Sequence, residues 1–314
     1  MRRLGTVAAA LALAACETAA PRVSPVPAPR PTAPAPAVIA RAAPSAQSAE
    51  AASFYRRVEA RLLSQGRLRR DRGGPDAPFG VDDVVRTFER VALFSEFVQI
   101  DGRYVAQQAR SKLRRWPGPV RVQVRFGASV PADVRAADTA TLRRYLDRLS
   151  RLTGHPIALV PAGGNFQLFV ASVDEQRALA PAVRRAEPSI SGATAQEITS
   201  LGRDTYCVVY ALSSAAAPED YVAAVALVRA EHPDLMRLAC YHEELAQGLG
   251  LANDSPTARP SIFNDDEEFA LLTAMDEILL RILYDPRLRI GMTAEEARPV
   301  VRRIAAELLA SGDT

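Results

Sequence analysis

A short segment of the chain combines two adjacent carboxylates with an amide at the spacing of a helical turn. Glu243 and Glu244 are neighbours, and Gln247 follows four residues after Glu243. Residues four apart on a helix point the same way, so two metal-binding side chains at this spacing can grip one ion while a neighbouring glutamate polarises its water. Asn253 and Asp254 end the segment with further polar groups. We therefore take this segment as the candidate site.

The same segment resembles the long zinc signature of metzincin peptidases, His-Glu-x-x-His-x-x-Gly-x-x-His/Asp. The resemblance implies a zincin-like α+β fold with a mixed sheet, an active-site-type helix and C-terminal helices. The spacing of the signature is kept here, but both imidazole ligands are replaced. The matching positions are Glu243 (first ligand), Glu244 (catalytic glutamate), Gln247 (second ligand), Gly250 (turn) and Asn253 or Asp254 (third ligand).

Segments further along extend the resemblance. Residues 261–264, Ser-Ile-Phe-Asn, stand where metzincins make a methionine-containing turn, with Phe263 in place of the methionine. Residues 272–284 resemble the C-terminal helix of matrixins. Residues 240–292 also resemble a family of proteobacterial lipoproteins described as a domain of unknown function, number twenty-nine twenty-seven, which carries the same Glu-Glu-x-x-Gln core. The family implies a lipoprotein but no reaction.

Zinc catalysis is not expected from these residues. Zinc lowers the pKa of its bound water toward neutrality, a role that no glutamate fills alone, and Gln247 is a neutral and poor zinc ligand. Shifting the signature to start at His242 places Ala246 at the second ligand position, so we interpret His242 as a packed helix histidine. His155 and His232 each precede a proline in predicted turns. We expect no metal and no cofactor.

Three roles remain open for the polar segment. Glu243, Glu244 and Gln247 can be structural, bonding one another and capping the turn at 253–254. They can line a cleft for a peptide or glycan. They can also catalyse hydrolysis at a non-zinc site centred on Glu244, although adjacent helix residues do not face each other across a substrate. The acidic run 265–268 matches no calcium loop and is interpreted as solvated. We predict a non-catalytic binding or assembly module, with the hydrolase as the alternative.

The elements that position this segment follow from hydrophobic periodicity. Residues 120–126 alternate strictly and predict a half-buried strand. Leucines at helical spacing over 142–152 predict a helix ending at Gly154, and apolar runs at 157–160, 166–170 and 206–212 predict strands. The site helix starts near Asp234, its expected N-cap. Helices after Thr273 and Thr293 follow from capping residues. Together these elements predict a mixed sheet with helices packed on it.

Two cysteines lie in the predicted domain. Cys207 belongs to the 206–212 strand and Cys240 to the site helix. In an oxidising envelope an isolated pair is more often bridged than free, so Cys207 and Cys240 are disulfide candidates. Neither has a partner at zinc-site spacing, which makes metal binding the weaker interpretation.

The N-terminus has the composition of a lipoprotein signal. Arg2 and Arg3 precede an apolar run that is too short to span a membrane, and the run ends Leu-Ala-Ala-Cys16. This ending resembles the bacterial lipobox. The resemblance implies removal of the signal peptide 1–15, lipidation of Cys16 with acyl chains such as palmitate, and attachment to a bacterial membrane facing the periplasm.

The remaining chain divides into three predicted parts. Residues 16–50 are an Ala/Pro-rich tether with too little apolar bulk to fold, residues 51–78 contain an amphipathic helix, and residues 79–314 form one domain. The net charge of the whole chain is +3 and includes Arg2 and Arg3, so the mature chain is nearly neutral and no nucleic-acid partner is expected. The expected partners are the membrane, through Cys16, and an envelope protein, peptide or glycan.

Overall fold

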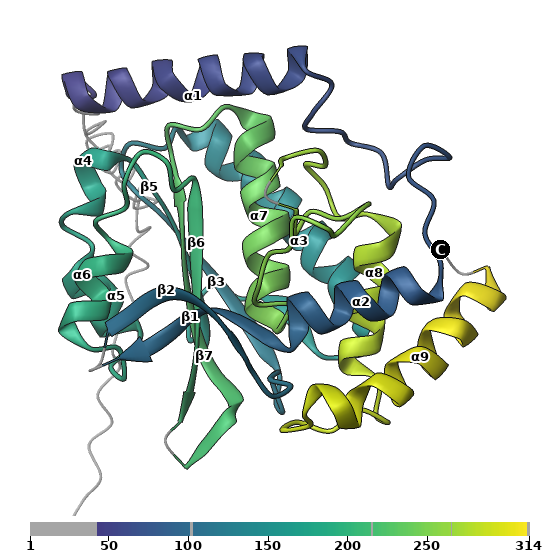
Figure 1. Cartoon of the computed structure of the whole chain (residues 1–314). Helices are drawn as coiled ribbons and strands as arrows, with labels where there is room; N and C mark the ends of the chain where they lie inside the picture. Colours follow the sequence, from purple (N-terminus) through teal and green to yellow (C-terminus); the bar gives the residue numbers. More distant parts are fainter. Residues whose placement is uncertain (1–42, 101–102, 215, 265, 313–314) are drawn as a thin grey trace, which may run out of the picture. The chain divides into compact units, whose positions relative to one another are not determined.

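The computed structural model describes residues 43–100, 103–214, 216–264 and 266–312 (Figure 1). In chain order the described elements are α1 (Ala46–Ser64), α2 (Val81–Ala92), β1 (Phe94–Ile100), β2 (Arg103–Arg110), β3 (Val120–Phe126), α3 (Ala132–Thr153), β4 (Ile157–Leu159), β5 (Phe166–Ala171), α4 (Val173–Gln176), α5 (Ala180–Ala186), α6 (Gly192–Ile198), β6 (Cys207–Ser214), β7 (Ala217–Arg229), α7 (Asp234–Leu249), α8 (Ala274–Tyr284) and α9 (Ala294–Ser311).

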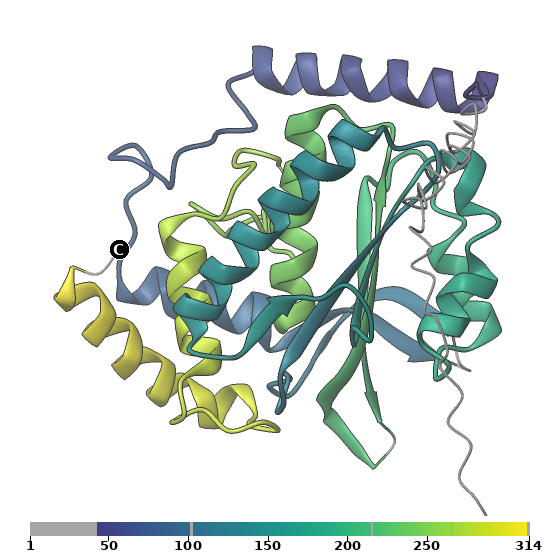
Figure 2. The same cartoon turned by 180° about the vertical axis from the view of Figure 1, so that it is seen from behind.

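A mixed five-stranded sheet forms the centre, in the order β4-β3-β5-β7-β6. The first four of these strands run parallel, whereas β6 pairs antiparallel with β7 and forms one edge. Figures 1 and 2 show α3, α7 and α8 on one face of the sheet and α5 and α6 on the other. A separate hairpin of β1 and β2 follows α2. The predicted mixed α+β class with C-terminal helices is confirmed.

Strand β7 connects the two hydrophobic cores. Ala224, Ala226 and Val228 belong to the core on the α7 face, and the intervening residues Val225 and Leu227 belong to the core on the α6 face. A strand that is apolar on both faces has no alternating pattern, which is why β7 was not predicted. The hairpin β1–β2 and helix α2 were not predicted either. The strands β3 to β6 and the end of α3 at Gly154, which has a φ of 63°, match the prediction.

Helix α1 begins earlier than the sequence predicted. It starts at Ala46, inside the segment interpreted as tether, because the Ser45 hydroxyl caps it by accepting a hydrogen bond from the Ser48 N–H. It ends at Ser64, two residues before Gly66 takes a φ of 74°. Its buried face packs Tyr55, with neighbouring apolar side chains, against the start of α7. The helix therefore lies beside the candidate site.

A buried charge network holds α7 against α3. The Arg237 guanidinium donates to the Asp138 carboxylate at 2.8 Å, and the Tyr241 hydroxyl donates to the same carboxylate at 2.8 Å. Asp234 is not the N-cap that the sequence predicted, because Pro233 occupies that position and the Asp234 carboxylate accepts from Arg237 instead. Rotation of α7 about its axis would separate Arg237 from Asp138 and leave buried charges uncompensated. The network therefore fixes this rotation.

The C-terminal end of α7 is closed by aromatic donors and close backbone contacts. The Trp116 indole donates to the Gly248 carbonyl at 2.8 Å, and the Tyr284 hydroxyl donates to the Leu249 carbonyl at 3.0 Å, so carbonyls that lack a helical partner are satisfied. Gly250 has a φ of 131°, and a Cβ there would lie 2.5 Å from the Arg114 carbonyl oxygen. The turn after α7 therefore requires glycine.

The C-terminal helices begin as predicted. Thr273 caps α8 and Thr293 caps α9, each in a capping box. The fully buried Asp276 carboxylate accepts from the Ser261 hydroxyl at 2.6 Å and from the Ile262 N–H at 3.1 Å, which ties the 261–264 loop to α8. Helix α9 packs on α2 through a buried apolar face. Within the described ranges, none of the helices combines the length and apolarity needed to cross a membrane.

Candidate functional site

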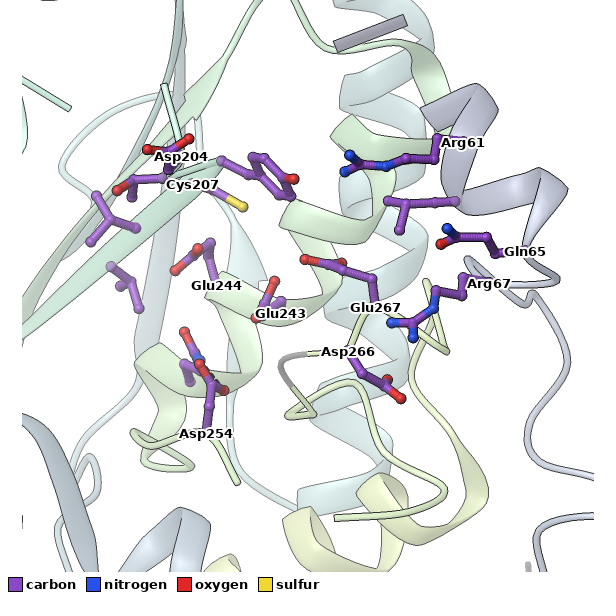
Figure 3. A pocket seen from close by; sticks show the side chains of 16 residues that line it. Arg61, Gln65, Arg67, Asp204, Cys207, Glu243, Glu244, Asp254, Asp266 and Glu267 are labelled. Atoms are coloured by element: carbon purple, nitrogen blue, oxygen red, sulfur yellow. Dashed lines mark hydrogen bonds between the residues drawn. The ribbon is translucent and has the colours of Figure 1, made fainter. Parts of the chain in front are cut away.

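A cleft of about 790 Å³ opens between α7, the edge strand β6 and the segment that follows α1 (Figure 3). Glu243, Glu244 and Gln247 of α7, the core of the candidate segment, line it. Glu244 is only 3% exposed, and Gln247 is 8% exposed, so both lie deep in the cleft. Glu243 is half-buried and lies nearer the opening. The structure thus brings together the core of the candidate segment.

Asp254, rather than its neighbour Asn253, lies beside Gln247 in the cleft. Its carboxylate accepts a hydrogen bond of 2.9 Å from the Gln247 side-chain amide, and Asp254 lines the cleft. Asn253 is 1% exposed, and its amide donates to the backbone carbonyls of Arg90 and Asp254 at 2.9 and 2.8 Å. Asn253 therefore fixes the turn, and of the two candidates only Asp254 faces the cleft.

The walls of the cleft come from β6, which the predicted disulfide links to the site helix, and from segments near the end of α1 and residue 266 that were not predicted to lie there. Edge strand β6 contributes Cys207, Val208 and Val209. Carboxylates dominate the lining, because six acidic side chains face only two arginines. An excess of one charge in a concave site concentrates ions of the opposite charge. The charged lining residues are Asp204, Glu243, Glu244, Asp254, Asp266 and Glu267 on the acidic side, with Arg61 and Arg67 on the basic side.

Two residues of the acidic run that was interpreted as a solvated stretch, Asp266 and Glu267, line the cleft. Backbone hydrogen bonds from the Leu68 N–H to the Glu267 carbonyl at 2.9 Å and from the Arg69 N–H to the Glu268 carbonyl at 2.8 Å hold this run beside the end of α1. Glu268 pairs with Arg69 and Arg259 outside the cleft lining. Asp265 lies outside the described residues. Glu267 lies in the cleft because its segment pairs with residues 68–69, and no local sequence pattern predicts a pairing of such distant segments.

A disulfide between Cys207 and Cys240 joins β6 to α7, as predicted. The Cα atoms are 5.9 Å apart, and 33 residues separate the two cysteines in sequence. Closing a loop of this length stabilises the folded chain by roughly 3 to 4 kcal/mol in the chain-entropy model. The bond fixes the edge strand against the helix that carries the site, and therefore fixes the width of the cleft beside it.

His242 is a structural residue, as interpreted from the sequence. Its ring stacks on Tyr145 with centroids 3.9 Å apart, and its Nδ1 accepts a hydrogen bond of 3.1 Å from the Leu272 N–H. Burial, with a smaller effect of the Arg148 charge, lowers the pKa of His242 to about 3. His155 lies elsewhere, with its Nε2 2.8 Å from the Gly118 carbonyl oxygen, and His232 is buried under Tyr55 of α1. The histidines do not converge on the cleft.

Burial of His242 predicts a specific loss of stability in acid. In the unfolded chain this imidazole binds a proton below about pH 6.5, whereas the folded protein keeps it neutral down to about pH 3. The unfolded state thus binds more protons, and the free energy of unfolding falls by up to about 1.4 kcal/mol per pH unit as the pH decreases through this window. Urea unfolding of His242→Gln between pH 7 and 4 is expected to show a shallower pH dependence. The half-buried His155→Gln is the control, and equal slopes for the two variants would contradict the assignment.

Comparison with known proteins identifies the chain by family. No curated protein and no solved structure matches it. The family model described as protein of unknown function DUF2927 matches residues 82–303, a range that extends from α2 into α9 and includes the whole of α7. The match covers more than half of the chain. The chain therefore belongs to the DUF2927 family.

Proposed function

We propose that the protein is a lipid-anchored lipoprotein of the bacterial cell envelope whose domain is a non-catalytic binding or assembly module of the metallopeptidase-like type. Its ligand occupies the acidic cleft between α7 and β6. The observation that carries the proposal is this cleft, where the buried Glu244 and the Gln247–Asp254 pair lie in about 790 Å³ of space beside an edge strand. Concave sites with a few convergent polar groups are the usual place for ligands.

Several features support a zincin-like scaffold. A helix with the signature spacing packs against a mixed sheet, and its turn glycine, Gly250, has a positive φ and a close backbone neighbour. Asp254 lies within hydrogen-bonding distance of Gln247, as the second and third positions of one metal site would. The imidazoles are absent, and a neutral amide is a poor zinc ligand. A scaffold of this kind retains the cleft but lacks the ligands that zinc catalysis requires.

The chemistry of the cleft favours a cationic peptide. Six carboxylates face Arg61 and Arg67. The electrostatic free energy of binding is therefore more favourable for a ligand with lysine or arginine side chains than for an anion. Strand β6 is the edge of the sheet, and residues 207–209 line the cleft. An extended peptide can add to such an edge through main-chain hydrogen bonds while its side chains enter adjoining pockets. Peptide therefore fits the lining better than a neutral glycan does.

The anchor and the compartment rest on the N-terminal sequence. A signal peptide over 1–15 and a lipidated Cys16 attach the chain to a membrane of the envelope, with the domain facing the periplasm. A disulfide at Cys207–Cys240 fits an oxidising compartment. The partners in this proposal are the membrane, through the lipid, and an envelope protein or peptide in the cleft.

Binding is expected to depend on the deep end of the cleft. The probe is a library of synthetic peptides that carry lysine or arginine, screened on the chain with Cys16→Ser. The double variant Glu244→Ala, Gln247→Ala removes a carboxylate and the amide that orients Asp254, and is expected to weaken binding by about tenfold or more, or about 1.4 kcal/mol. Titration calorimetry with the best peptide measures the effect.

The matched control replaces the same two residue types on the opposite face of the sheet. Gln196→Ala, Glu197→Ala on α6 keeps the change in charge and lies away from the cleft. It should bind the peptide as the unmodified chain does. If both double variants bound the peptide with the affinity of the unmodified chain, the ligand would not bind in this cleft and the proposal would be wrong.

The alternative is a hydrolase with a non-zinc site centred on Glu244. One observation favours it, because a carboxylate that is almost fully buried and yet lines a cavity has the environment of a general acid or base. It predicts peptide or glycan turnover that Glu244→Gln lowers by about 100-fold or more. Glu268→Gln, outside the cleft, is the control. An absence of turnover by the unmodified chain across broad substrate panels would exclude this alternative.

A further inference from the structure

The disulfide and two carboxylates of the cleft converge on one point. The Cys207 sulfur and single carboxylate oxygens of Glu243 and Glu244 all lie within 4.8 Å of one another. Figure 3 shows the Cys207 sulfur directed into the cleft toward the two glutamates. A sulfur and two carboxylate oxygens at this separation match the ligand types that zinc takes in proteins. In the oxidised chain the sulfur is bonded to Cys240 and offers no thiolate.

The second cysteine lies on the same helix face as the glutamates. Cys240, Glu243, Glu244 and Gln247 are spaced i, i+3, i+4 and i+7 along α7, which places them in one stripe. A separate small cavity of about 10 Å³, lined by Cys207, Cys240 and Glu243 among others, adjoins the disulfide. This volume holds about one water-sized sphere. The chain therefore has both converging donors and space beside them.

We propose that reduction of the Cys207–Cys240 disulfide creates a binding site for zinc or a similar thiophilic divalent cation, with Cys207, Glu243 and Glu244 as ligands. This site was not predicted from the sequence, because neither cysteine has a neighbour at zinc-site spacing. The carboxylate ligands come from α7 and the sulfur from β6, and only the packing of strand on helix brings them together.

The reducing step is a thiol–disulfide exchange with a dithiol reductant. A reductant thiolate reaches Cys207 from the cleft and attacks its sulfur, so that the Cys207–Cys240 bond breaks and the Cys240 sulfur leaves with the electron pair and takes up a proton. The second thiolate of the reductant then attacks the mixed disulfide and releases Cys207 as a thiolate. The reductant becomes a disulfide, and the chain gains two electrons.

Metal binding and reduction reinforce each other in this site. A free Cys207 thiolate lies beside two carboxylates, and like charges at such distances oppose its formation. A bound divalent cation offsets these charges. By linkage, the factor by which reduction strengthens metal binding equals the factor by which metal favours the reduced state. The inference does not rest on the proposed peptide ligand, since it concerns the cation that the cleft holds in the reduced chain.

A matched pair of cysteine variants tests the site. On the Cys16→Ser background, Cys240→Ser keeps the Cys207 thiol at the cleft, whereas Cys207→Ser keeps only the buried Cys240. Both variants lose the disulfide, so they share its effect on stability, and circular dichroism checks that both remain folded. Zinc affinity is measured by competition with a chromophoric chelator. The Cys240→Ser variant is expected to bind one zinc ion per chain at least about tenfold more tightly than Cys207→Ser or the oxidised chain does.

The two glutamate ligands are tested in a chain that keeps both Cys207 and Cys240. Glu243→Gln, Glu244→Gln is reduced with dithiothreitol, freed of it under nitrogen, and compared with Asp204→Asn, which removes a cleft carboxylate outside the trio. Zinc binding of the reduced chain should be lost in the first variant and kept in the second, and cobalt in the site should show thiolate-to-metal absorption. Equal zinc affinity in both redox states, no zinc in the reduced chain, or full affinity after loss of both glutamates would each overturn the proposal. Peptide binding to the oxidised chain is measured separately, so failure here does not decide the proposed function.

Discussion

Helix α7 is buried along most of its length, and its polar side chains therefore decide how the elements around it pack. Most of its side chains from Leu235 to Leu249 are buried, including polar ones, and a buried polar side chain must find a partner or a solvent-filled cavity. Arg237 and Tyr241 meet Asp138 of α3, and His242 meets Tyr145 and the backbone of residue 272. The remaining polar stripe can reach solvent only through the cleft. The core packing of α7 thus determines where the site is.

The edge strand and the segment after α1 turn that stripe into a cleft. The disulfide holds β6 against α7, and backbone hydrogen bonds between residues 68–69 and 267–268 bring the acidic run to the opposite side. These connections join segments that are up to about 200 residues apart in the chain, as in the Arg69–Glu268 ion pair. The acidic run adds Asp266 and Glu267 to the four other carboxylates that line the cleft. The cationic peptide proposed for the oxidised chain and the metal ion proposed for the reduced chain would both be attracted by this charge.

Local patterns were sufficient to predict the elements that carry the site. Strict alternation located β3, leucine spacing with Gly154 located α3, and capping residues located α8 and α9. The signature spacing placed Glu243, Glu244 and Gln247 on one face. Strand β7 was not predicted because both of its faces are buried. The predicted start of α1 was too late, because its alanine-rich first turns have the composition of a tether and only the Ser45 cap marks the start of the helix. The sequence could not decide whether Asn253 or Asp254 lies beside Gln247, since both are polar and the turn after α7 sets the direction of their side chains.

We propose that the cleft belongs to a metallopeptidase-like scaffold in which other residues stand at the positions of the histidine ligands. The decisive experiment introduces imidazoles with Glu243→His, Gln247→His, because Asp254 already lies beside position 247. Metal content of the oxidised chain with Cys16→Ser is measured by elemental analysis, with and without the two substitutions. We expect no stoichiometric zinc in the unmodified oxidised chain and one zinc ion per chain in the double variant. Stoichiometric zinc in the unmodified oxidised chain, or none in the folded double variant, would overturn the metallopeptidase-like scaffold.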